Sequence, residues 1–278
     1  MSKPASSRKN PGIGTSMAEQ ADRHMLYEAS VQEPEAEMDF VEETFRELRD
    51  REPLTLREDF CGTGNSSCEW VRRDPQHTAV GVDIDREVLE WGRENHLPRL
   101  APEVRERVQL IEGDVLTTRT EPVDVVLGMN FSYYLFHTRE ALREYFEVAR
   151  NNLVEDGILF LDAFGGYEAF REMEEATEYD DFTYVWDQAD YDPISGHMGC
   201  RIHFRFPDGS RLDDAFVYEW RMWTLPEIQE LLQEAGFSEV TVYWEGTDEE
   251  TGEGDGEFFP AERGEADAGW IAYIVAEK

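Results

Sequence analysis

The stretch that most constrains the fold of this chain is residues 54–71, where an alternating apolar segment leads into acids, a small-residue turn and a helical pattern. The alternation has the period of a strand, and Glu58 and Asp59 end it. Gly62 and Gly64 follow in the turn. Glycines let a backbone bend sharply and let a ligand approach it closely. Because open α/β sheets bind ligands where parallel strands end, the stretch predicts a strand, a ligand-binding loop and a helix.

Three further apolar segments follow, and each ends in an acid or an amide. Helical patterns separate them, so strands and helices alternate along this part of the chain. This order predicts a doubly wound α/β fold around a mostly parallel sheet. An acid at the tip of the second strand of such a unit can accept hydrogen bonds from ribose hydroxyls. The polar residues at the three strand ends are Asp83, Asp114 and Asn130.

Together, the four strand-end motifs resemble those of the class I S-adenosylmethionine-dependent methyltransferases. The matching segments are 58–64 for the Gly-rich loop, 81–84 for the acidic second strand, 113–115 for the adenine contact and 129–133 for the fourth strand. One departure is Phe60, which stands where the family usually has the first glycine of the loop. The resemblance implies a seven-stranded sheet and S-adenosyl-L-methionine as the cofactor.

The resemblance also implies cofactor contacts at each motif. Asp83 would hold the ribose, with Ile84 against the adenine face, and Asp114 would accept from the adenine amino group. A turn-forming role is the alternative for Asp83 and Asp114. The full set implied is Tyr27, Glu58, Cys61, Gly62, Gly64, Asp83, Ile84, Asp114, Val115, Asn130 and Phe131.

Methyl transfer from a sulfonium needs no protein nucleophile, because the cofactor carries an activated methyl group. The catalytic candidates are therefore residues that would orient the acceptor or accept a proton: Asn130, Tyr133, His137 and Arg221. His137 would serve as a general base, since an imidazole titrates near neutral pH. Arg221 would bind an acceptor carboxylate. A helix-start histidine and an ion pair with a local acid are the alternatives for these two residues.

A Rossmann dehydrogenase fits the first motif less well. Its fingerprint needs a third glycine for close helix packing, and Ser67 stands at that position. The carboxylates of Glu58 and Asp59 would repel a pyrophosphate but suit a ligand with a cationic amino-acid tail.

Charge and composition limit the partners. Lys and Arg total 26 against 62 Asp and Glu, which gives a net charge of −36. Such a surface repels phosphate backbones and disfavours nucleic acid, although adaptation to high salt gives the same bias in any halophilic protein. The three cysteines form no C-x-x-C pair, so we expect neither a disulfide framework nor a metal site. No apolar run reaches the roughly 18 residues of a membrane span, and we expect a cytoplasmic protein.

The chain divides into four parts. Residues 1–17 are expected to be a disordered N-terminus, 18–166 the cofactor-binding α/β core, 167–223 an antiparallel β insert or lid, and 224–278 the rest of the core. Residues 246–268, acidic and rich in glycine, are expected to form a mobile loop within the last part. The insert would cover the acceptor and set its choice; the alternative is a dimerisation hairpin, so a homodimer stays open.

We therefore expect an S-adenosylmethionine-dependent methyltransferase that acts on a small-molecule acceptor by direct in-line transfer. The alternatives are a catalytically silent S-adenosylmethionine-binding protein and a methyltransferase for RNA or protein. The sequence distinguishes neither the acceptor nor methylation at nitrogen, oxygen, sulfur or carbon.

Overall fold

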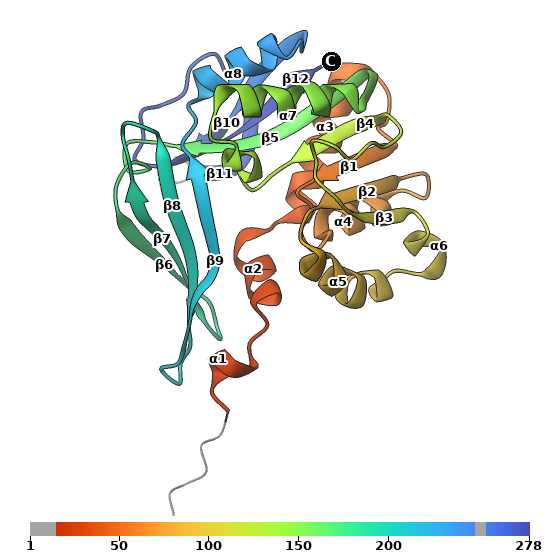
Figure 1. Ribbon diagram of the computed structural model, residues 1–278. Helices are drawn as coiled ribbons and strands as arrows, with labels where there is room; N and C mark the ends of the chain where they lie inside the picture. The colour runs from red at the N-terminus through yellow and green to blue at the C-terminus, as the bar shows by residue number, and fades with distance from the viewer. Residues whose placement is uncertain (1–14, 248–253) are drawn as a thin grey trace, which may run out of the picture.

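The computed structural model describes residues 15–247 and 254–278 of the chain. Its central sheet is eight-stranded, in the order β11-β10-β12-β5-β4-β1-β2-β3 (Figure 1). The neighbouring strands from β3 to β5 pair in parallel, whereas β12 and β10 are antiparallel to their neighbours. The doubly wound, mostly parallel fold is thus confirmed. The bounds are β1 Thr55–Asp59, β2 Thr78–Asp83, β3 Val108–Glu112, β4 Val123–Gly128, β5 Leu153–Gly165, β10 Glu239–Thr247 and β12 Trp270–Glu277.

The eighth strand, β11 (Gly254–Pro260), lies in the segment expected to be a mobile loop. It pairs antiparallel with β10, and residues 248–253 of the same segment lie outside the described residues. Phe258 explains the ordered strand, because its ring packs 4.3 Å from that of Tyr273 and 6.1 Å from that of Phe40. A single half-buried aromatic side chain thus anchors a strand in an otherwise acidic, glycine-rich stretch.

Helices cover both faces of the central sheet. Alternate side chains of a strand point to opposite faces, so Val125 and Leu127 of β4 pack against α3 and α4, whereas Val126 packs with α7 and α8. This produces one hydrophobic core on each face. The helices are α3 Pro34–Arg49, α4 Asn65–Arg73, α5 Arg86–Asn95, α6 Pro102–Arg105, α7 Arg139–Asn151 and α8 Leu225–Glu234, with 3-10 turns η1 Leu97–Arg99 and η2 Ser132–Leu135.

The insert forms a separate four-stranded antiparallel sheet in the order β6-β7-β8-β9. Its strands are β6 Met173–Glu178, β7 Thr183–Tyr191, β8 His197–Arg205 and β9 Arg211–Arg221. The turn expected at residues 207–210 joins β8 to β9, and Gly209 supplies its positive φ of 83°. The sequence did not predict β6, because acids replace the apolar alternation there, as is common on an edge strand.

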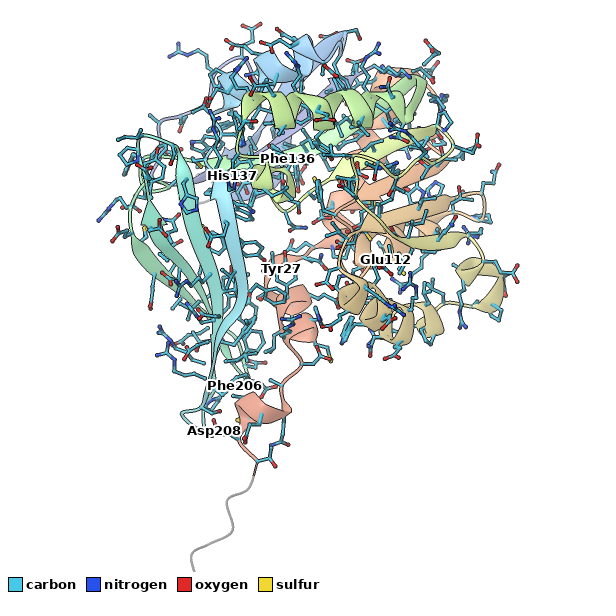
Figure 2. All side chains as sticks on the ribbon, in the orientation of Figure 1. Tyr27, Glu112, Phe136, His137, Phe206 and Asp208 are labelled. Carbon is cyan, nitrogen blue, oxygen red and sulfur yellow. The ribbon has the colours of Figure 1, made fainter. Side chains whose placement is uncertain are left out.

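Two short helices precede α3: α1 (Met17–Gln20) packs on the antiparallel sheet, and α2 (Arg23–Val31) lies between the two sheets. Residues 1–14 of the segment expected to be disordered lie outside the described residues, while 15–17 lead into α1. The main-chain N–H of Met17 donates to Asp208 at the tip of the β8–β9 hairpin, 2.8 Å away. Figure 2 shows Asp208 beside α1 and Tyr27 between the two sheets. Within the described ranges, no helix is both long and apolar enough to cross a membrane.

Candidate functional site

A cavity of ≈ 530 Å³, called here the cofactor cavity, lies at the carboxyl ends of β1, β2 and β4. The Gly-rich loop forms one wall, and α2 and β9 form the opposite wall. This is the edge at which open α/β sheets bind ligands. Of the residues expected to bind the cofactor, those that line it are Tyr27, Glu58, Cys61, Gly62, Asp83 and Asn130.

The Gly-rich loop combines an open face with a tightly packed one. Gly62 has a φ of 54°, and a Cβ there would meet no atom within 4 Å, so a ligand can approach the backbone. Gly64, with a φ of 72°, precedes the first turn of α4 and lies outside the cavity lining. A Cβ on Gly64 would come within 2.7 Å of Leu110 Cδ2. Gly62 thus faces the ligand, whereas Gly64 allows the loop to pack on β3.

Phe60 keeps the loop shape despite replacing a glycine. Its φ of 58° lies in the left-handed region, which costs about 1–2 kcal/mol for a residue with a Cβ. Its ring packs 5.3 Å from Tyr145 and 6.2 Å from Phe136. Burial of the aromatic side chain offsets the backbone strain.

Glu58 organises the start of α4. Its Oε2 accepts hydrogen bonds from both the main-chain N–H and the hydroxyl of Ser67, and a carboxylate at a helix N-terminus also interacts favourably with the helix dipole. Burial raises the pKa of Glu58 to about 8, while the Ser67 hydrogen bonds oppose the rise. A cationic ligand in the cavity would favour the charged form.

Asp83 links the end of β2 to the Gly-rich loop. Its Oδ2 accepts from Gly62 N at 2.8 Å and its Oδ1 from Asp85 N at 2.8 Å. Burial raises the pKa of Asp83. The side chain lines the cofactor cavity, where each oxygen has a second lone pair for a ribose hydroxyl.

Ile84 and Asp114 do not line the cofactor cavity. Ile84 is 74% exposed at the turn after β2, and its apolar side chain is free to contact an adenine ring. Asp114 is exposed, and its Oδ1 accepts from Leu116 N at 2.9 Å. The turn-forming alternative for Asp114 therefore has direct support from the structure, because part of the carboxylate already accepts a hydrogen bond within the turn.

Asp59 lines the cofactor cavity and belongs to a buried network that extends to Val115, which does not line it. Arg57 Nε lies 2.8 Å from Asp59 Oδ1, and both side chains are fully buried. Arg57 also donates to the carbonyl oxygens of Val115 and Thr118. Burial raises the pKa of Asp59 to about 6, and the Arg57 charge opposes that rise. This network ties β1 to the loop after β3.

A second cavity of ≈ 610 Å³, the acceptor cavity, lies between the central sheet and the antiparallel sheet. It shares Tyr27, Asn130 and Tyr218 with the cofactor cavity, and these three residues are called here the junction. A methyl group passing from one cavity to the other would cross the junction. The aromatic residues of the insert that line the acceptor cavity are Tyr184, Trp186, Tyr218 and Trp220.

An unusual backbone turn shapes the junction. Asn130 and Phe131 are both in the left-handed region, with φ of 58° and 56°. The carboxylate of Asp162, on β5, accepts from both of their main-chain N–H groups, at 2.7 and 2.8 Å. Strained residues persist where the surroundings hold them, and they concentrate at functional sites. Phe131 lines the acceptor cavity rather than the cofactor cavity.

Three of the four catalytic candidates lie away from the junction. Tyr133 is fully buried: its ring packs 5.9 Å from Phe146, and its hydroxyl donates to the Asp162 carbonyl oxygen at 2.7 Å. The η2 turn points this side chain into the core instead of the acceptor cavity. Only Asn130 of the four lines a cavity at the junction.

The other two candidates lie near the C-terminal end of β9. His137 Nε2 is 2.8 Å from the carbonyl oxygen of Glu219, and Figure 2 shows this side chain above Tyr27, beside the end of the antiparallel sheet. Arg221 stacks 3.7 Å from the Trp223 ring centroid and pairs with Glu227 at 3.0 Å. The ion-pair alternative for Arg221 therefore holds, and neither residue lines the acceptor cavity.

Two acids with roles at the site were not identified from the sequence. Asp162 positions the junction, and its only signal was an acid inside an apolar strand. Glu28 of α2 accepts a hydrogen bond from the Thr63 hydroxyl at 2.6 Å and contacts His96 Nε2 at 2.7 Å. Glu28 thereby fastens α2 to the Gly-rich loop. Nothing in its sequence context distinguished it from the many surface acids.

Comparison with known proteins finds a methyltransferase domain and structures of the same fold. Residues 60–157 match the family model of a methyltransferase domain. No curated protein matches the chain. An S-adenosylmethionine-dependent methyltransferase from Clostridium acetobutylicum has a TM-score of 0.66 at 18% identity, covering 91% of this chain and 96% of that one.

Two further solved structures share the fold over nearly the whole chain. CalS10, an amino pentose methyltransferase from Micromonospora echinaspora, has a TM-score of 0.63 at 17% identity, covering 98% of this chain and 100% of that one. The sugar N-methyltransferase KedS8 from Streptoalloteichus sp. has a TM-score of 0.62 at 16% identity, covering 100% of this chain and 98% of its own. The chain thus carries a methyltransferase domain over residues 60–157 and shares the fold of solved S-adenosylmethionine-dependent methyltransferases.

Proposed function

We propose that this methyltransferase acts on an amine nitrogen of a small-molecule acceptor bound in the acceptor cavity. The observation that carries the proposal is the lining of that cavity, which combines aromatic rings with the carboxylates of Glu168, Glu175 and Glu245. None of the described residues that line it is Lys, Arg or His. Carboxylates attract an ammonium group, and ring faces bind it through cation–π contacts. An alcohol, thiol or carbon acceptor gives a neutral product that gains little from such a lining.

The names of two structural neighbours support the same chemistry. CalS10 is described as an amino pentose methyltransferase and KedS8 as a sugar N-methyltransferase. An amino sugar or a similar polar amine is therefore the acceptor class we propose to test first. The position of the antiparallel sheet along the acceptor cavity supports the further proposal that the insert sets acceptor choice.

The chain contributes binding and positioning to the reaction. S-adenosylmethionine supplies an activated methyl group when bound. The proposed holders are Gly62 and Asp83, at the loop and the end of β2. Tyr27 and Tyr218 would exclude water from the junction while Asn130 sets its shape. An acceptor that binds as an ammonium group must lose one proton to free its lone pair, and a cavity carboxylate or solvent can accept that proton.

A matched acceptor panel tests the proposal. The protein is incubated with S-adenosylmethionine and with amino sugars, the same sugars bearing hydroxyl in place of amine, and simple alkylamines. We expect S-adenosylhomocysteine release and an N-linked methyl group, detected by mass spectrometry, with amines alone. Cofactor binding without turnover of any acceptor would favour a silent binding protein. Methylation of RNA or protein, but of no amine in the panel, would favour a macromolecular substrate.

A further inference from the structure

A third cavity of ≈ 770 Å³, called here the acidic cavity, runs along α3 and faces β10 and β11. It shares Asn130, Phe131 and Glu245 with the acceptor cavity. A molecule held at the junction can therefore extend into the acidic cavity. The cavity is large enough for several non-hydrogen atoms beyond the group that receives the methyl.

Every charged residue that lines the acidic cavity is an acid. Most of these acids are exposed to solvent, as expected for a chain with a net charge of −36. Glu37 is different, because it is only 7% exposed. Its Oε2 accepts from the Ser66 hydroxyl at 3.2 Å. A further hydrogen bond comes from the main chain of Glu33, and within the described ranges no cationic side chain pairs with the carboxylate. A high negative surface charge explains solvated acids but not a buried acid of this kind.

A buried carboxylate without a cation is unfavourable, and burial raises the pKa of Glu37 to about 7. A cation bound beside Glu37 would remove this penalty. Aromatic rings stand along the same cavity: Phe40 stacks 4.5 Å from Tyr273, and Phe258 lies 4.3 Å from Tyr273. Ring faces together with a carboxylate suit an organic ammonium group. No set of three or more metal-ligating side chains occurs in the described part of the chain.

We infer that the acidic cavity binds a second cationic group of the acceptor, with Glu37 as its carboxylate partner. The substrate class is then small molecules with two amino groups, one methylated at the junction and the other held beside α3. This inference rests on the proposed function, because it assumes that the acceptor reaches the junction through an amine. It adds a second binding site to the proposed function, and it requires the acceptor to carry a second positive charge.

The competing assignment for Glu37 is a partner for the α-ammonium group of the cofactor. Glu37 does not line the cofactor cavity, whereas Glu58 and Asp83 do. S-adenosylhomocysteine carries the same α-ammonium group as the cofactor. Its affinity for a Glu37 variant therefore separates the two assignments.

The experiment compares alkyl α,ω-diamines with alkylamines of the same chain length. Binding to wild-type protein saturated with S-adenosylhomocysteine is measured by calorimetry, and methylation with S-adenosylmethionine by mass spectrometry. A charge-assisted hydrogen bond to the second amine should make the best diamine bind on the order of tenfold more tightly than its monoamine. Glu37→Gln should reduce that advantage to less than about twofold and leave S-adenosylhomocysteine affinity unchanged. Glu35→Gln, an exposed neutral change on the same helix, is the control and should keep the full advantage.

Each outcome decides a different point. If amines are bound and methylated but diamines show no advantage in the wild-type protein, the second site is wrong and the proposed function stands. If neither series is bound or methylated, the amine acceptor itself is wrong. Loss of S-adenosylhomocysteine affinity in Glu37→Gln would assign Glu37 to the cofactor instead. If the diamine still binds more tightly than its monoamine in a folded Glu37→Gln protein, the inference is also overturned. Potassium chloride added to the same ionic strength as the diamine checks for a nonspecific salt effect.

Discussion

Replacing Asp162 by asparagine should leave the protein as stable as before or more stable, while it slows methyl transfer. The Asp162 carboxylate is 7% exposed and holds the main-chain N–H groups of Asn130 and Phe131 at 2.7 and 2.8 Å. Each of these two residues sits in the left-handed region, at a cost of about 1–2 kcal/mol. Without both carboxylate contacts, the turn at the junction is free to relax.

The expected stability follows from two opposing effects. Burial raises the pKa of Asp162 from 3.8 to about 7. Since a tenfold change in ionisation corresponds to about 1.4 kcal/mol, the charged form is penalised by roughly 4 kcal/mol near pH 7. Asparagine removes this penalty, but its NH₂ faces a main-chain N–H, which costs about 1–3 kcal/mol. The free energy of unfolding at pH 7 should therefore stay level or rise by up to about 3 kcal/mol.

The sign of the pH dependence is also fixed. A carboxyl whose pKa is higher in the folded state binds its proton more tightly there, so this group's stabilising contribution is lost as pH rises from 3.8 towards 7. The free energy of unfolding of Asp162→Asn should consequently exceed that of the wild type at pH 7 but not near pH 4. Urea unfolding at both pH values measures it, and the exposed change Glu155→Gln on the same strand is the control.

Activity should respond in the opposite direction. A shift of about 1 Å at a reacting centre can reduce the rate on the order of 10²-fold, so kcat/KM for the best amine should fall by that amount. Destabilisation by more than about 3 kcal/mol at pH 7 would show that the charged carboxylate is net favourable and refute the pKa argument. Unchanged turnover would show that the turn at Asn130 does not position the reaction.

Other predictions follow from single contacts. Asp83→Ala should weaken S-adenosylhomocysteine binding on the order of tenfold or more in calorimetry, because a charge-assisted hydrogen bond contributes about 1.5–3 kcal/mol. His137→Ala and Arg221→Ala should keep turnover within about twofold, since neither side chain lines the acceptor cavity. Because burial raises the pKa of Glu58 to about 8, the ligand-free protein should melt at a higher temperature at pH 6 than at pH 8. Given the net charge of −36, the melting temperature should rise from low to molar salt, and a flat response would contradict the halophilic interpretation.

The parts of the fold and the site that the sequence predicted are those specified by short segments. Gly62 and Asp83 lie at strand ends, where the apolar alternation and the adjacent small or acidic residue are visible within a few positions. The parallel sheet follows from repetition of that pattern. Strand β11 was missed because its order depends on the contact of Phe258 with Tyr273, which are distant in sequence.

Side-chain direction within a correctly located segment was harder to predict. Tyr133 is the last residue of the fourth-strand motif, yet the η2 turn rotates it into the core, and Phe131 reaches the acceptor cavity instead. Asp162 and Glu37 were indistinguishable from other acids because their roles arise from burial, which the fold creates. Sequence patterns therefore located the loops of the site but not the buried acids behind them.

The net charge of −36 combines two kinds of acid with different causes. Exposed acids such as Glu52, which pairs with Arg46 at 2.7 Å, are explained by a solvated, salt-tolerant surface. Glu37, Glu58 and Asp162 are buried, line cavities around the junction, and have raised pKa values. Burying such groups without a cation costs free energy, so surface adaptation gives no reason to keep them. A sulfonium cofactor and the amine acceptor that we propose would both bring positive charge to this place, and their binding would stabilise the acids that the fold alone leaves uncompensated.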